Sequence, residues 1–265
     1  MKRIVLPFLL IIFLMTGCGG GQDSITGTNY NKIIVGIDDT IPPFGFRDEN
    51  GEIIGFDVDL AKEAARRMGA AVEFKPIVWS KKNEELNSRN IDLIWNGLII
   101  TPERKEEFLF SKPYLESRQI VLARQNDTFN IRSEYDLEGR IVGVQAGSFS
   151  EIYFEKNSKL KDSLREFKTY ENFKEEFKAL YIGEIDVLIC DEVVGRFEMN
   201  RNFGRFEVVD ATIGSVTKLG IGFRKDDTEL RDRVQNVFDE MVKDGTAQEI
   251  SQEWFQADLI KSHGW

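Results

Sequence analysis

One alternation of strand-like and helix-like segments occurs twice along the chain, and it constrains the fold more than any other feature. Each copy has three apolar, strand-like runs separated by helical patterns. The runs lie at Lys32–Ile37, Val72–Val78, Ile91–Trp95, Ile141–Gln145, Leu164–Thr169 and Ile185–Cys190. Because strands that alternate with helices form parallel sheets covered by those helices, the sequence predicts two similar α/β lobes.

The segment after the second copy is expected to return to the first lobe. A strand at Phe206–Val209 closes the second copy, and a returning strand is predicted at Lys218–Arg224. An amphipathic helix at Asp227–Lys243 and a last helix at Thr246–Phe255 follow. Gly245 separates these helices, since glycine commonly ends a helix.

The N-terminus has the pattern of a secretory signal. The basic pair Lys2-Arg3 precedes the apolar run Ile4–Met15, which is too short to span a membrane. Cys18 follows the small pair Thr16-Gly17, and this pattern resembles the bacterial lipobox, in which signal cleavage leaves an acylated cysteine. The alternative is a plain signal peptide with an incidental cysteine. We expect a lipid on Cys18 that anchors the protein outside the cytoplasm, at the cell surface or in the periplasm.

Removing the expected signal peptide, residues 1–17, leaves a mature chain of about 248 residues. Its first part, residues 18–30, is rich in glycine and polar residues and is predicted to be a flexible tether. The mature chain has 33 Lys and Arg residues against 45 Asp and Glu residues, a net charge of −12. Such a surface repels phosphate, so we expect no nucleic-acid partner.

The stretch from residue 90 to residue 114 contains the first candidate for a ligand-binding residue. Ile91–Trp95 is predicted to be a buried strand, Asn96-Gly97 a turn, and Thr101-Pro102 the start of a short helix. Arg104 then lies in the first helical turn, where a cation opposes the helix dipole by about 0.3–1 kcal/mol. Either a neighbouring glutamate pairs with Arg104 on a solvated face, or Arg104 binds the carboxylate of a ligand.

Other predicted strands also end in residues that suit a ligand, and in α/β sheets ligands bind beyond the carboxyl ends of strands. These ends carry Asp38-Asp39, Trp79, Gln145–Ser148 and Asp191. If the lobes face each other, Arg104 and the amides near Ser148 suit a carboxylate, while Asp191 suits an ammonium. A ligand with both charges on adjacent atoms is an α-amino acid.

Each of these residues also has a purely structural interpretation. Asp191 alone would be a helix N-cap, Ser148 part of a tight turn and Trp79 a core aromatic. It is their expected convergence with Arg104 on one cleft that favours a binding site.

The residue inventory argues against several other functions. His263 is the only histidine, which argues against a Ser-His-Asp triad, histidine acid–base catalysis and a His-ligated zinc site. Phosphate-loop, dinucleotide-binding and G-x-S-x-G motifs are missing from the sequence, although carboxylate chemistry remains open. If Cys18 is acylated, Cys190 has no disulfide partner and is expected to be a buried thiol. We expect no metal, no cofactor and no catalytic residue.

Seven segments resemble the family 3 extracellular solute-binding proteins, which are the polar amino-acid receptors of ABC importers. The segments are Pro42–Phe46, Gly55–Ala61, Ile91–Ile94, Thr101–Lys105, Phe110–Tyr114, Val142–Ser148 and Ile185–Asp191. The resemblance runs from about residue 31 to residue 258 and is specific for the family rather than for the ligand.

The resemblance implies a two-lobed, periplasmic-binding-protein-like fold whose lobes close around a ligand. It places lobe 1 at residues 31–117 and 219–265 and lobe 2 at residues 122–213. Hinges are implied near residues 117–122 and 213–219. The implied partners are an amino acid and an ABC permease in the membrane, and we expect the receptor to be a monomer.

The resemblance also implies roles for individual residues. Arg104 would hold the ligand carboxylate with the amides of Ile99 and Phe149, which follows Ser148. Asp191 and the Gly97 carbonyl would bind the α-ammonium. Trp79 would lie against the ligand, and Asp38 or Asp39 would reach a polar side chain.

Two positions depart from the family pattern. Ile99 stands where the family usually has Ser or Thr, which removes a hydroxyl contact of roughly 0.5–1.5 kcal/mol. Ile41 stands where an aromatic residue is frequent. These changes predict a less polar pocket or an altered ligand, and Asn96 would restore one hydrogen bond.

Two other classes of function stay open. Some relatives with this fold are cyclohexadienyl or arogenate dehydratases, so an enzyme is one alternative. The other is a ligand-sensing domain that signals without transport.

Overall fold

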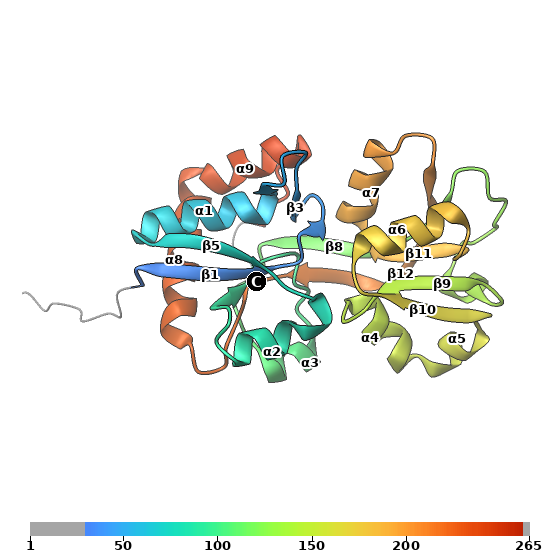
Figure 1. Ribbon diagram of the computed structural model, residues 1–265, viewed down its shortest axis with the longest axis horizontal. Helices are drawn as coiled ribbons and strands as arrows, with labels where there is room; N and C mark the ends of the chain where they lie inside the picture. The colour runs from blue at the N-terminus through green and yellow to red at the C-terminus, as the bar shows by residue number, and fades with distance from the viewer. Residues whose placement is uncertain (1–29, 262–265) are drawn as a thin grey trace, which may run out of the picture.

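The computed structural model describes residues 30–261. Figure 1 shows two sheets that lie end to end, each flanked by helices, and we call the two surrounding parts lobe 1 and lobe 2. The expected signal segment, Cys18, the tether before Tyr30, and His263 lie outside the described residues. Between residues 30 and 261, no helix is long and apolar enough to cross a membrane.

The sheet of lobe 1 has five strands in the order β5-β1-β6-β13-β7. These are β1 (Lys32–Ile37), β5 (Ala71–Pro76), β6 (Leu93–Ile94), β7 (Leu109–Phe110) and β13 (Gly222–Phe223). β1 runs parallel to β5 and β6, whereas β13 runs antiparallel to β6 and β7. The first copy of the alternation therefore forms the parallel part, and the returning chain supplies the antiparallel strand.

The sheet of lobe 2 has the order β10-β9-β11-β8-β12. Its strands are β8 (Leu115–Arg124), β9 (Ile141–Gln145), β10 (Glu166–Tyr170), β11 (Val187–Asp191) and β12 (Phe206–Leu219). β9 is parallel to β10 and β11, and β8 is antiparallel to β11 and β12. The predicted mixed, mostly parallel sheets flanked by helices are thus confirmed in both lobes.

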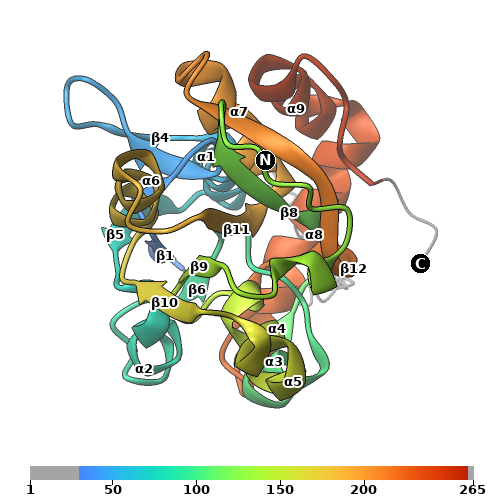
Figure 2. The same ribbon diagram turned by 90° about the vertical axis from the view of Figure 1, so that its right-hand side faces the viewer.

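Helices cover both faces of each sheet. Lobe 1 has α1 (Phe56–Met68), α2 (Lys82–Asn87), α3 (Pro102–Glu107), α8 (Thr228–Asp244) and α9 (Thr246–Phe255). Lobe 2 has α4 (Phe149–Lys156), α5 (Ser158–Ser163), α6 (Phe173–Ile182) and α7 (Glu192–Arg201). Figure 2 looks onto lobe 2, with α6 and α7 on one side of its sheet and α4 and α5 on the other. Shorter elements are β2 (Thr40–Ile41), β3 (Gly45–Arg47), β4 (Ile53–Ile54), η1 (Trp79–Lys81) and η2 (Glu134–Leu137).

The core of lobe 1 contains a cluster of aromatic rings. Trp95 and Tyr114 are almost fully buried, and Phe238 of α8 packs edge-on against both rings. Helix α1 packs on the core of lobe 1 through a buried face that includes Leu60 and Ala64.

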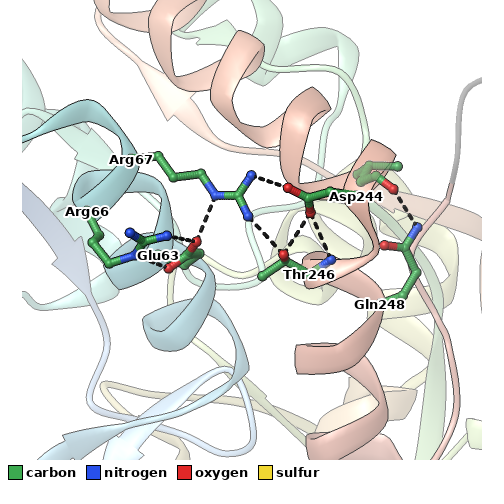
Figure 3. A network of polar contacts seen from close by, with 7 residues as sticks. Glu63, Arg66, Arg67, Asp244, Thr246 and Gln248 are labelled. Carbon is green, nitrogen blue, oxygen red and sulfur yellow. Dashed lines mark hydrogen bonds and ion pairs between the residues drawn. The ribbon is translucent and has the colours of Figure 1, made fainter.

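The side chain of Arg67 links helix α1 to the C-terminal helices α8 and α9 by hydrogen bonds, as Figure 3 shows. Arg67 at the end of α1 donates hydrogen bonds to Asp244 (2.6 Å) and Thr246 (2.8 Å) at the junction of α8 and α9. It also donates to Glu63 one turn earlier, at 2.7 Å. The last part of the chain therefore packs on the lobe in which the chain began.

Two long strands, β8 and β12, run side by side from one lobe to the other (Figure 1). Their ladder extends from the pair Arg124–Phe206 to the pair Leu115–Leu219, and its register shifts after Val209 and after Ile213. The hinges expected near residues 117–122 and 213–219 fall within this ladder and stay predictions.

Several elements of the structure differ from the prediction. The single strand expected at Lys218–Arg224 is wrong, because β12 ends at Leu219 and β13 begins at Gly222. The chain changes partners there, from β8 in one sheet to β6 and β7 in the other. The strand expected at Ile91–Trp95 contracts to the two residues of β6, and α5 and β7 were not predicted.

Candidate ligand-binding site

A cavity of about 50 Å³ lies between the lobes and has room for several water molecules. It is lined from lobe 1 by Ile41, Phe44, Trp79, Asn96, Gly97, Ile99 and Arg104. From the other side it is lined by Gln119, Gln145, Ser148, Phe149, Ser150, Phe173, Ile189, Cys190, Asp191 and Val194. Most of the predicted site residues therefore meet at one place, although the chain separates them by up to 150 positions.

Arg104 lies in the cavity wall and bridges the two lobes. The Thr101 hydroxyl caps α3 by accepting a hydrogen bond from the Arg104 amide at 3.1 Å. The guanidinium donates to the carbonyl oxygens of Ile99 (2.9 Å) and Gly147 (3.0 Å). Only 4% of the residue is exposed, so the alternative of a solvated pair with a glutamate is wrong. Burial lowers the pKa of Arg104 to about 10.

Asp191 combines the structural role and the proposed binding role. Its Oδ1 atom caps α7 by accepting from the Val193 amide at 2.9 Å, and it also accepts from the Ser117 hydroxyl at 2.7 Å. Its Oδ2 atom is buried without a hydrogen-bond partner among the described residues. Burial raises the pKa of Asp191 to about 6. An ammonium group would satisfy both the charge and the open acceptor.

The turn before α4 supplies part of the lobe 2 side of the cavity wall. Ser148 caps α4, its hydroxyl accepting from the Glu151 amide at 3.1 Å. The capping places Phe149, the first residue of α4, in the cavity wall. Gly147 adopts a φ of +73° there, and a Cβ atom on it would lie 2.7 Å from the Cα atom of Ser80 in lobe 1.

Asp57 and Tyr114 form a buried network beneath Gly97 that sequence reasoning missed. Asp57 Oδ2 accepts hydrogen bonds from the Gly97 amide (2.6 Å) and from the Tyr114 hydroxyl (2.9 Å). Burial raises the pKa of Asp57 to about 7. Gly97 has a φ of +62°, and a Cβ atom on it would lie 2.9 Å from the ring of Phe44, so a side chain there would be strained. Both Asp57 and Tyr114 fall within the family segments, which was the available signal.

Lys82 is a second buried cation near Arg104, and it was also missed. Its Nζ atom donates to the carbonyl oxygens of Gly147 (2.9 Å) and Trp79 (3.2 Å), and lies 5.1 Å from the Trp79 ring centre. Burial and the neighbouring Arg104 lower the pKa of Lys82 to about 7. The sequence of this helix is mostly polar and gives no sign that one lysine turns inward.

Asp38 and Asp39 are the predicted site residues that the structure does not place in the cavity wall. Asp38 is buried behind it, where its carboxylate accepts from the Thr40 amide and hydroxyl and from the Gln145 amide. Asp39 faces away and pairs with the exposed Arg47 at 2.5 Å. Neither carboxylate lies at the cavity surface.

Sequence and structure comparisons agree on the family. The sequence model described as "Bacterial extracellular solute-binding proteins, family 3" matches residues 33–257. The L-cystine-binding protein TcyJ of Escherichia coli K12 is 31% identical over 229 residues, 86% of this chain and 84% of that protein. The arginine-binding extracellular protein ArtP of Bacillus subtilis is 30% identical over 259 residues, 96% of this chain and 98% of that protein.

A solved structure with the same architecture extends the comparison. The substrate-binding protein of an ABC uptake transporter from Streptococcus pneumoniae, with bound histidine, has a TM-score of 0.82 and 34% identity. The match covers 88% of this chain and 95% of that one. The chain belongs to the bacterial extracellular solute-binding proteins, family 3.

Proposed function

We propose that the protein captures an L-amino acid, or a close derivative, between its lobes and delivers it to an ABC importer. The single observation that carries the proposal is the pair formed by Arg104 and Asp191. A buried guanidinium from lobe 1 and a buried carboxylate oxygen from lobe 2 face the same small cavity. An α-amino acid supplies a carboxylate for the first and an ammonium for the second.

Backbone groups complete the proposed contacts. The amides of Ile99 and Phe149 support the carboxylate, and the Gly97 carbonyl supports the ammonium. Trp79, Ile41 and Asn96 flank the ligand, with Ile99 giving this part of the wall an apolar side chain. The names of the relatives, which bind cystine or arginine, support an amino acid as the ligand class.

Ligand capture requires the lobes to separate and close. We assign the hinges to residues 117–122 and 213–219, where β8 and β12 pair with shifted register. The lobes then correspond to residues 31–117 with 219–265, and to residues 122–213. Interlobe hydrogen bonds from Arg104 and Lys82 to Gly147 would form only on closure.

Calorimetry of the purified mature protein against the L-amino acids tests this function. We expect micromolar or tighter binding of at least one, about −8 kcal/mol or more favourable. The corresponding decarboxylated amine and the N-acetylated amino acid serve as controls, because each lacks one of the two charges. Absence of binding to every α-amino acid would contradict the proposal.

The attachment to the membrane is a separate proposal that rests on the N-terminal sequence. A lipid on Cys18 would hold a monomeric receptor beside a membrane permease, with residues 18–30 as the tether. Intact mass spectrometry of the mature protein should show an N-terminus at Cys18 that carries acyl chains. A mature N-terminus at another residue, or an unmodified Cys18, would argue against a lipid at this residue.

A further inference from the structure

We propose that the ligand has an uncharged side chain and that the Gln119 amide donates a hydrogen bond to an acceptor on it. This inference rests on the proposed amino-acid receptor and goes one step further, to the class of amino acid. Two independent observations carry it: the balance of charges in the cavity wall, and the Nε2 atom of Gln119 on β8, which has no hydrogen-bond partner among the described residues.

The α-carboxylate and α-ammonium of an amino acid would pair with all the charged side chains of the cavity wall. Among the described residues that line the cavity, Arg104 is the only cation and Asp191 the only anion. A charged side chain would therefore enter the closed site without a counter-charge. Burying an unpaired charge is far more costly than burying a hydrogen-bonded neutral group.

Two charged groups behind the cavity wall, Asp38 and Lys82, are held by protein partners. Asp38 lies behind Gln145 and accepts a hydrogen bond from its side-chain amide. It also accepts from the backbone amide and the hydroxyl of Thr40. Lys82 directs its ammonium at the carbonyl oxygens of Gly147 and Trp79. Neither Asp38 nor Lys82 reaches the cavity surface. A ligand side chain that paired with Asp38 or Lys82 would thus have to displace an existing contact.

Gln119 offers the complementary neutral group. Its Oε1 atom accepts from the Ser150 hydroxyl at 2.7 Å, which orients the amide, and its Nε2 atom has no hydrogen-bond partner among the described residues. The residue lines the cavity and is only 3% exposed. A buried donor of this kind is satisfied by an acceptor on the ligand.

The strand register decides which part of the ligand this donor meets. In the ladder of β8 and β11, Gln119 lies opposite Asp191, and the residue two positions earlier, Ser117, is hydrogen-bonded to Asp191. Gln119 therefore lies at the ammonium end, whereas the carboxylate is held from lobe 1 by Arg104. A donor at that end meets a side-chain oxygen rather than the α-carboxylate.

A calorimetric panel on the unmodified mature protein tests the charge argument. It comprises serine, threonine, asparagine and glutamine, the apolar alanine and valine, and the charged lysine, arginine, aspartate and glutamate. We expect the tightest neutral ligand to bind at least about tenfold more tightly than any charged one. Tighter binding of a charged amino acid would overturn this inference while leaving the receptor function intact, whereas no binding of any amino acid would refute the receptor function itself.

Replacement of Gln119 by Met, which has similar length but no donor, tests the residue. We expect about tenfold weaker binding of ligands with a side-chain acceptor and unchanged binding of alanine, and a smaller loss for Ser150→Ala. Gln125→Met, at an exposed position just after β8, is the matched control. Thermal unfolding of each variant verifies folding. An equal loss for alanine, or no loss for any ligand, would overturn the role of Gln119.

Discussion

Arg104 and Gly147, one from each lobe, are joined by a 3.0 Å hydrogen bond from Nη2 to the carbonyl oxygen. Lys82 donates to the same oxygen at 2.9 Å. One backbone carbonyl of lobe 2 thus accepts from two buried cations of lobe 1. The conformation of the turn at Gly147 therefore affects how closely the two lobes can approach each other.

Gly147→Ala should weaken ligand binding by at least about tenfold. The new Cβ would lie 2.7 Å from the Ser80 Cα in the other lobe, so the closed arrangement is disfavoured. Gly139→Ala is a matched control, because Gly139 has a nearly equal φ of +70° and open space around it. Both variants should lose about 1–2 kcal/mol of stability from backbone strain. Calorimetry and thermal unfolding separate the two effects, and equal affinities for the two variants would contradict the clash.

Arg104→Lys should weaken binding by about 100-fold although the charge is kept. The guanidinium donates to the Ile99 and Gly147 carbonyls while facing the cavity, and a single ammonium cannot reproduce this planar fork. The control is Arg89→Lys, since Arg89 forms only a surface pair with Asp226 at 3.3 Å. Titration calorimetry gives both affinities. A loss below about threefold for Arg104→Lys would show that only the charge matters.

Ligand affinity should fall as the pH is lowered through the pKa of Asp191. Burial raises this pKa to about 6, and only the ionised carboxylate attracts an ammonium. Binding should be pH-independent with respect to this group well above pH 6 and weaken by about tenfold per unit below it. Asp191→Asn should bind weakly at every pH and lose this slope. The same slope in the variant would assign the titration to another group.

Asp57→Asn should increase stability at pH 8. Because burial raises the folded-state pKa of Asp57 to about 7, the folded protein holds a proton that the unfolded chain releases above about pH 4. Stability therefore declines between about pH 4 and pH 7, by about 1.4 kcal/mol per unit for this group. Asparagine still accepts from Gly97 and Tyr114 but does not ionise. Denaturant unfolding at several pH values should show a flatter profile for the variant, and an unchanged profile would contradict the assignment.

The parts of the fold that depend on local pattern could be predicted from the sequence. The alternation of apolar runs and amphipathic segments gave both sheets, because each run is buried by the helices next to it in the chain. The break at Gly220 could not be predicted in this way. It arises where the chain leaves one sheet for the other, and only the tertiary arrangement defines that point.

The site shows the same division between local and distant effects. Arg104 and Asp191 stand at element ends that the sequence marks with Thr101-Pro102 and an apolar run. Lys82 and Gln119 carry no such mark, because their partners Gly147 and Ser150 come from remote segments. Which residues of a polar helix or a crossing strand turn inward depends on segments that are remote in the sequence.

The choice between Asp38 and Asp39 could not be made from the sequence for a related reason. Adjacent residues beyond a strand end point in different directions, so one carboxylate turned inward to Gln145 and the other outward to Arg47. The conformation of the following loop decides which carboxylate turns inward, and the sequence pattern does not define that conformation.

The shared carbonyl of Gly147 also links closure of the lobes to the anionic end of the ligand. Two cations meeting at one neutral oxygen repel each other, and burial shifts the pKa of each downward. A ligand carboxylate would bring negative charge to this point, so it would favour closure whatever side chain the ligand carries. Recognition would then have two parts. The carboxylate that all amino acids share would favour closure, and the contacts of each lobe with the side chain would select among amino acids.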